Sequence, residues 1–94
     1  MSLKERLSDL SGAVASAMVY AHDEYPEWRS YEAHREDLYD LWAEIRPKLK
    51  RDLERAEYVD RMLREMIGAF DAGEKERGRE LACDLYNFDI EKLR

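Results

Sequence analysis

Apolar residues recur every three or four positions over the first part of the chain, which is the spacing of one face of an α-helix. These residues are Leu3, Leu7, Leu10, Val14, Ala17 and Ala21. Ser2, followed three residues later by Glu5, has the form of a capping box, in which the serine side chain accepts a hydrogen bond at the start of a helix. The pattern therefore predicts an amphipathic helix over about residues 3–21.

The last part of the chain carries a second pattern of this kind. It follows Asp71-Ala72-Gly73, where Gly73 suits the left-handed residue that commonly comes after the end of a helix. A broad apolar face is then formed by Leu81, Ala82, Leu85, Tyr86, Phe88, Ile90 and Leu93. We expect a helix over about residues 74–93, separated by a turn from the helix before it.

A longer apolar stripe occupies the middle of the chain. Its members are Leu38, Leu41, Trp42, Ile45, Leu49, Leu53, Ala56, Val59, Leu63, Met66, Ile67 and Phe70. At about 100° per residue they fall within a sector of about 140° of a helix surface. Pro47 lies inside this segment, but the stripe keeps its phase on both sides of it, and no Gly, Asn or Ser stands nearby to make a turn. Because a proline on the solvent side can bend a helix without ending it, the pattern predicts one long helix over about 27–70, kinked at Pro47.

The lengths of the three expected helices leave apolar surface uncovered. The central helix would span roughly 65 Å, and each flanking helix could cover only one half of it as an antiparallel neighbour. Tyr58 and Met62, four residues apart and off the main stripe, indicate a second surface that needs a cover. We therefore expect a single all-α domain over residues 1–94 that completes a helical bundle by dimerisation. The alternative is a sharper kink at Pro47 that folds all segments into one compact monomeric bundle.

The charge balance narrows the class of partner. The chain carries 22 Asp and Glu against 16 Lys and Arg, a formal net charge of −6. Phosphate repels such a chain, which disfavours nucleic acid and anionic membranes. Cys83 is the only cysteine, so no intrachain disulfide can form, as is typical of a cytoplasmic protein, and we expect it to be a small buried side chain. No apolar run approaches the ~20 residues that span a bilayer, and we expect no signal peptide.

The ionisable residues form no recognisable catalytic or metal-binding pattern. Glu36, Asp37 and Asp40 resemble a carboxylate site for a divalent cation, but on a helical wheel they point away from the apolar stripe. His34 lies near the edge of the stripe, where we expect a partly buried side chain rather than a ligand. No helix-bundle metal motif, glycine-rich phosphate loop or nucleophile elbow occurs. We predict no catalytic, metal-binding or cofactor-binding residues, and the alternative is a metal-dependent enzyme with a carboxylate site at an interface.

Aromatic residues are concentrated near the first connection. Six of the ten aromatic residues lie within residues 20–42, and Trp and Tyr are favoured anchors at protein interfaces. Three of these aromatic residues are expected to be partly exposed, and the two residues that lie off the stripe of the central helix join them as candidates. The candidate partner-binding residues are therefore Tyr25, Trp28, Tyr39, Tyr58 and Met62. The sequence thus predicts a non-enzymatic helical protein–protein interaction module, which would be a self-associating scaffold, an adaptor or an inhibitor of another protein.

A basic stretch over residues 46–55 supports a further alternative, contact with nucleic acid. Its cationic residues are Arg46, Lys48, Lys50, Arg51 and Arg55, which could touch a phosphate backbone. The preceding residues 23–44 are strongly acidic, and opposite charges at two positions along a chain suit pairing with a second copy or with an oppositely charged protein. We therefore expect a protein partner or a homodimer in preference to nucleic acid.

Overall fold

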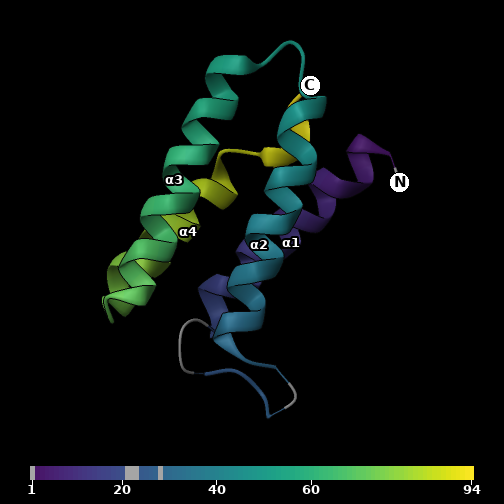
Figure 1. The fold of residues 1–94 in the computed structure, drawn as a ribbon. Helices are drawn as coiled ribbons and strands as arrows, with labels where there is room; N and C mark the ends of the chain where they lie inside the picture. The colour runs from purple at the N-terminus through teal and green to yellow at the C-terminus, as the bar shows by residue number, and fades with distance from the viewer. Residues whose placement is uncertain (1, 21–23, 28) are drawn as a thin grey trace.

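The computed structural model describes residues 2–20, 24–27 and 29–94, and the regular secondary structure of these residues is all helical. Figure 1 shows its elements in chain order. They are α1 (Leu3–Tyr20), α2 (Tyr31–Ile45), the 3₁₀ turn η1 (Arg46–Lys48), α3 (Leu53–Asp71), α4 (Lys75–Asn87) and the 3₁₀ turn η2 (Ile90–Lys92). The predicted all-α class is confirmed, but the middle of the chain forms two helices instead of one.

Helix α1 follows the sequence pattern closely. The Glu5 backbone N–H donates to Ser2 Oγ at 3.2 Å, so the predicted serine cap is present. The apolar face buries Leu7, Leu10, Val14 and Ala17 against the rest of the molecule. The helix ends at Tyr20, within a residue of the predicted boundary.

The predicted long helix over 27–70 is wrong, because the chain reverses direction after Pro47. Helix α2 begins at Tyr31, where the Ser30 side chain accepts a hydrogen bond from the Ala33 N–H at 3.1 Å, and it ends at Ile45. Pro47 lies in η1, where its missing N–H ends the α-helical hydrogen-bond pattern. The N–H groups of Arg51 and Asp52 then both donate to the Arg94 carbonyl at 3.0 Å. The bonds that hold this turn thus come from the far end of the chain.

Helices α2 and α3 lie antiparallel beside each other, as Figure 1 shows. Trp42 Nε1 donates to Asp60 Oδ1 at 3.0 Å near the turn, and the Tyr31 hydroxyl donates to Asp71 Oδ1 at 2.7 Å at the other end of the pair. The two halves of the apolar stripe therefore face one shared core. The surplus apolar surface that suggested dimerisation is covered within the chain, so that argument fails and dimerisation itself stays a prediction.

The turn between α3 and α4 has the predicted glycine cap. Gly73 adopts a φ of 80°, its N–H donates to the Phe70 carbonyl at 3.0 Å, and the Glu74 N–H donates to the Ala69 carbonyl at 2.8 Å. This pair of bonds is a Schellman motif, which satisfies carbonyls at the helix end. Helix α4 stops at Asn87, short of the predicted residue 93. Asp89 adopts a left-handed φ of 67° and redirects the chain into η2.

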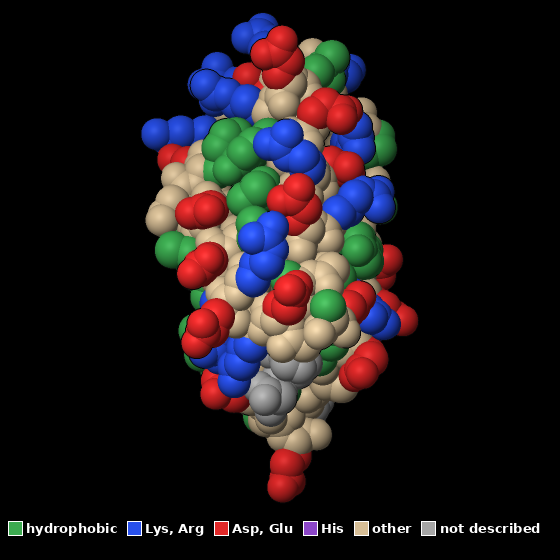
Figure 2. All heavy atoms as spheres, turned by 90° about the vertical axis from the view of Figure 1, so that its left-hand side faces the viewer, with side chains coloured by type: hydrophobic (Ala, Val, Ile, Leu, Met, Phe, Trp, Pro, Cys, Tyr) green, Lys and Arg blue, Asp and Glu red, His purple; other side chains and the backbone are tan. Residues whose placement is uncertain are grey.

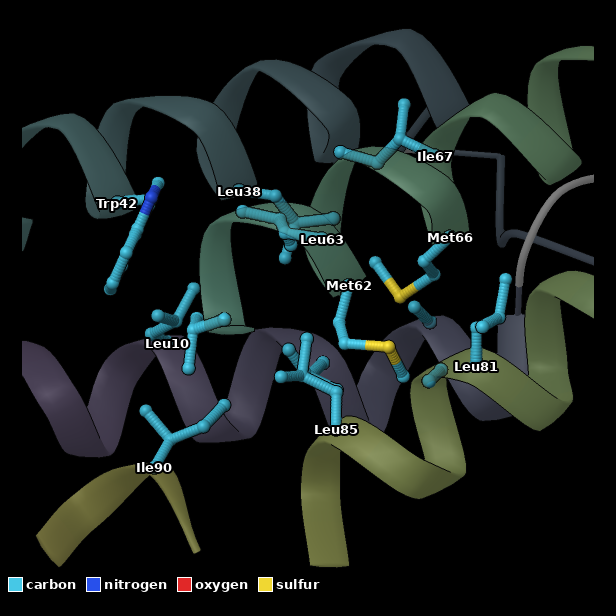
Figure 3. Packing of buried hydrophobic residues seen from close by; sticks show 14 of the residues in the cluster. Leu10, Leu38, Trp42, Met62, Leu63, Met66, Ile67, Leu81, Leu85 and Ile90 are labelled. Atoms are coloured by element: carbon cyan, nitrogen blue, oxygen red, sulfur yellow. The ribbon is translucent and has the colours of Figure 1, made fainter. Parts of the chain in front are cut away.

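The core is one apolar cluster to which all four helices and η2 contribute. Figure 3 shows Leu10 of α1, Leu38 of α2, Leu63 of α3, Leu85 of α4 and Ile90 of η2 converging on it. Each of these five side chains is at most 2% exposed. The described residues span 36 × 25 × 18 Å, so the helices pack side by side in a short bundle.

Candidate functional site

A basic cleft lies at the end of the bundle where the α2–α3 connection meets the start of α1 and the end of the chain. Its volume is about 1020 Å³. Among the described residues, two carboxylate side chains line it, Asp52 and Glu91, against seven cationic side chains, which are Lys4, Lys48, Lys50, Arg51, Arg55, Lys92 and Arg94. In the view of Figure 2, several Lys and Arg side chains project from this upper end of the molecule.

The cleft depends on contacts between segments far apart in the sequence. Besides the two bonds to its carbonyl, Arg94 donates its own N–H to Asp52 Oδ2 at 2.9 Å. Asp52 stands directly before α3 but makes no side-chain cap there. Its carboxylate instead fastens the end of the chain to the α2–α3 connection, and Lys92 and Arg94 line the cleft together with Lys50 and Arg51.

Most cations of the basic cleft form no ion pair with a described carboxylate. Lys48 Nζ lies 3.8 Å from Glu44 Oε1, and Lys92 Nζ lies 3.2 Å from Asp89 Oδ2. The other five side chains are exposed and form no ion pair with any residue that the structure describes; they are Lys4, Lys50, Arg51, Arg55 and Arg94. Outside the cleft the chain carries nine basic and twenty acidic side chains. An acidic protein therefore presents one concentrated region of positive charge.

The bottom of the basic cleft is apolar. Leu7 and Leu93 line it and are 2% and 4% exposed, and Leu3 is partly exposed beside them. The methylene stems of the surrounding lysines and arginines add further apolar surface below their charged ends. Leu53, the first residue of α3, is 60% exposed directly after Asp52 in the chain. The surface thus combines a cationic rim with aliphatic groups.

A second hollow, of about 540 Å³, lies between α1 and α2. His34 is 1% exposed at its base, where Nε2 donates to the Ala13 carbonyl at 2.9 Å and Nδ1 accepts a hydrogen bond from the Tyr25 hydroxyl. Burial lowers the pKa of His34 below its ordinary value and raises the pKa of Tyr25 to about 12. Both groups are therefore neutral near pH 7, and they join α1, the connection after it and α2.

The acidic residues considered as metal ligands do not form a metal site. Glu36, Asp37 and Asp40 are exposed, and Asp37 Oδ2 accepts a hydrogen bond from Arg29 Nη2 at 2.9 Å. Within residues 2–20, 24–27 and 29–94, no group of three His, Cys, Asp or Glu is placed to hold a metal ion. The geometry of the single chain thus gives the metal-dependent alternative no support.

The predicted partner-binding residues lie at separate places. Tyr25 is half-buried against His34, and Tyr39 is 38% exposed on α2. Tyr58 packs on Phe88 with 4.6 Å between ring centroids, and Met62 is 7% exposed and points toward α4 beside Leu85 (Figure 3). The second surface inferred from Tyr58 and Met62 is therefore covered by the same chain, not by a partner. Trp28 lies outside the described residues.

Two further sequence expectations need correction. Cys83 is exposed instead of buried, because it lies on the outer side of α4, where Asn87 Nδ2 approaches its sulfur at 3.5 Å. Arg46, counted with the basic stretch, does not line the basic cleft, since it pairs with Glu57 and with Asp60 at 3.0 Å. The contribution of Lys4, Lys92 and Arg94 was missed, because no local pattern brings these residues to the connection.

Comparisons with protein-family models, with curated proteins and with solved structures give no significant match. No described helix combines the length and the apolar character needed to cross a membrane. Proposals on function therefore depend on the surface of this chain itself.

Proposed function

We propose that this chain is a non-enzymatic binding module that recognises an acidic partner protein through the basic cleft. The observation that carries the proposal is the set of five exposed cations that form no ion pair with a described residue, gathered from three segments of an acidic chain. Like charges held together destabilise a fold slightly unless a partner neutralises them. A concentrated patch also steers an oppositely charged partner toward one end of the molecule.

A protein partner is favoured over nucleic acid. A nucleic acid extends past any short patch, and its phosphates would then face the twenty acidic side chains outside the cleft. The described lining residues also include no aromatic side chain on which a base could stack. A short acidic segment of a protein can occupy the cleft without meeting the acidic surface.

Fluorescence anisotropy with a labelled octaglutamate peptide tests the proposal. The double variant Lys50→Glu/Arg55→Glu reverses two unpaired charges, and we expect it to weaken binding by about tenfold or more. Arg77→Glu is the matched control, because Arg77 is exposed on α4 outside the basic cleft. Equal affinities for the double variant and the control would refute the proposal.

Self-association is a second form of the same proposal, which the segregation of charge supports. The basic cleft of one copy is complementary to the acidic surface of another, and a homodimer or a longer assembly could form in this way. Light scattering at about 20 mM and about 500 mM salt tests it, because screening weakens contacts between exposed charges. A salt-dependent mass that Lys50→Glu/Arg55→Glu abolishes is the expected result, and a monomer at low salt would exclude this form.

A further inference from the structure

The basic cleft contains more than charge, and its aliphatic groups bear on the kind of segment that fits. If the proposed function holds, we infer that the partner segment is an acidic peptide carrying apolar anchor residues, with aliphatic side chains seated on Leu3 and on the methylene stems of the neighbouring lysines and arginines, and carboxylates on the rim. A uniformly charged polyanion would leave this apolar surface in contact with water or with charge. An alternating acidic and aliphatic segment satisfies both parts.

The shape of the cleft agrees with an extended segment. Its three walls are the first turn of α1, the α2–α3 connection and the last residues of the chain, so the surface is concave and not flat. Its volume of about 1020 Å³ is at the upper limit of the range of about 300–1,000 Å³ usual for small-molecule pockets. This space suits several consecutive side chains better than a single small anion.

The aliphatic surface sets the specificity, while the cations set the attraction. Charges at an exposed rim mainly speed the encounter and are screened by salt. Burial of an aliphatic side chain is not screened, and it distinguishes one acidic segment from another. Leu3 is the accessible member of the apolar group, because Leu7 and Leu93 are almost fully covered by the chain.

Three labelled probes of similar length test the inference. One is an eight-residue peptide of alternating glutamate and leucine, one is its glutamate–serine counterpart of equal charge, and one is an oligothymidine of equal charge. At about 150 mM salt we expect the leucine peptide to bind about tenfold tighter than the serine peptide, since part of the apolar surface of each leucine is buried. The oligothymidine should bind no better than the serine peptide.

Two variants separate the two parts of the cleft. Leu3→Gln keeps the charge and the helix propensity at that position, and it should remove most of the advantage of the leucine peptide while leaving the serine peptide unchanged. Lys50→Glu/Arg55→Glu should weaken both peptides. Circular dichroism confirms that each variant folds, and the comparison of the two peptides on the unmodified protein needs no variant.

The outcomes distinguish the inference from the proposed function. Equal affinity for the leucine and serine peptides, or tighter binding of the oligothymidine, overturns the apolar anchor even if the charge reversal weakens binding. If the charge reversal changes no affinity, the basic cleft is not the contact surface and the proposed function fails as well.

Discussion

The two ends of the bundle differ in how many of their cations form ion pairs. At the end formed by the α1–α2 connection and the α3–α4 turn, Glu24 pairs with Lys75 at 3.0 Å and with Arg79 at 2.7 Å, and Arg35 pairs with Asp71 at 3.0 Å. At the end that holds the basic cleft, the connection is fastened mainly by backbone bonds to Arg94. Arg46 also joins this connection to α3 through Glu57 and Asp60, but five cations of the basic cleft form no ion pair with a described residue.

This difference distinguishes charged side chains that stabilise the fold from charged side chains that are available to a partner. The hydrogen bonds from Lys75 and then Arg79 hold the pKa of the Glu24 carboxyl below its ordinary value, so the two cations stabilise its ionised form. A cation that forms no ion pair makes no such contribution to the stability of the fold. We therefore expect substitutions at the paired end to change stability, and charge reversal at the basic cleft to change binding alone.

The largest stability effect should come from Gly78→Ala at the paired end. Helix α4 approaches α3 so closely there that an added Cβ would lie 2.8 Å from Phe70 Cζ and nearer still to two other ring atoms. Phe70 is 1% exposed, so its ring can move only by displacing other core side chains. Overpacking typically destabilises by about 1–3 kcal/mol, and alanine returns about 1 kcal/mol of helix propensity. We expect a net loss of up to about 2 kcal/mol in the free energy of unfolding, measured with urea.

Gly68→Ala is the matched control for this substitution. Gly68 lies inside α3, and a Cβ there meets no atom within 4 Å. Only the propensity difference then operates, and we expect a gain of about 0.5–1 kcal/mol. A similar gain at Gly78 would show that the α3–α4 contact is looser than described.

Acid should weaken the molecule through His34, which joins α1 to α2 near the paired end. Burial lowers the pKa of His34, the Ala13 carbonyl and Asp37 act against this effect, and Arg29 adds to it. The unfolded chain, in which the pKa is near 6.5, then binds more protons than the folded chain. The contribution of neutral His34 to the free energy of unfolding is fully present above about pH 6.5. It falls as the pH drops below that value, by at most about 1.4 kcal/mol per pH unit.

His34→Gln identifies the source of this pH dependence. Urea unfolding of both proteins between about pH 7 and pH 5.5 compares their slopes in a range where most carboxyl groups stay ionised. The variant should be less stable at pH 7 and should show a flatter slope. Parallel slopes for the two proteins would assign the acid sensitivity to other groups.

The helices at the two ends of the chain could be predicted from local patterns, because their signals are local. The Ser2 cap and the Gly73 turn each involve residues within one or two helical turns of each other. The buried residues of the middle segment were also predicted well, with Leu53 as the clear exception at 60% exposure. That exposed residue marks the point where the predicted continuous stripe is interrupted.

The reversal after Pro47 could not be predicted in the same way. A continuous helix and an antiparallel hairpin both place the two halves of the stripe against apolar neighbours, so the phase of the stripe does not distinguish them. The N–H groups of Arg51 and Asp52 are satisfied by Arg94, which is about forty residues away. The basic cleft was missed as a site for the same reason, since Lys4, Lys92 and Arg94 reach it only through the tertiary fold.

A smaller effect is expected from Tyr31→Phe, which removes one hydroxyl at the paired end. This hydroxyl donates to Asp71 Oδ1 at 2.7 Å and approaches the Ile67 carbonyl at 3.3 Å. Loss of a hydrogen bond to a charged acceptor that stays partly solvated should destabilise by about 1 kcal/mol. Tyr39→Phe is the control, because Tyr39 is 38% exposed, and it should change stability by less than about 0.5 kcal/mol. Equal effects would remove Tyr31 from the contacts that fasten α2 to α3.

The smallest stability effect is expected from Lys50→Glu/Arg55→Glu in the basic cleft. Both side chains are exposed and form no ion pair in the described chain, so reversal breaks no ion pair and relieves repulsion among the seven cations of the cleft. A glutamate at position 55 also lies in the first turn of α3, where negative charge is favourable. The free energy of unfolding should therefore change by less than about 0.5 kcal/mol or rise slightly.

Glu24→Lys makes the opposite charge reversal at the paired end, and its effect on stability can be compared directly with that of Lys50→Glu/Arg55→Glu. It places a cation against Lys75 and Arg79, so two attractive contacts become repulsive and the midpoint of thermal unfolding should fall. High salt should narrow the difference between this variant and the unmodified protein, because exposed charges are screened. If Lys50→Glu/Arg55→Glu lowers the midpoint as much as Glu24→Lys does, the cations of the basic cleft contribute to the fold, and their availability to a partner would no longer follow.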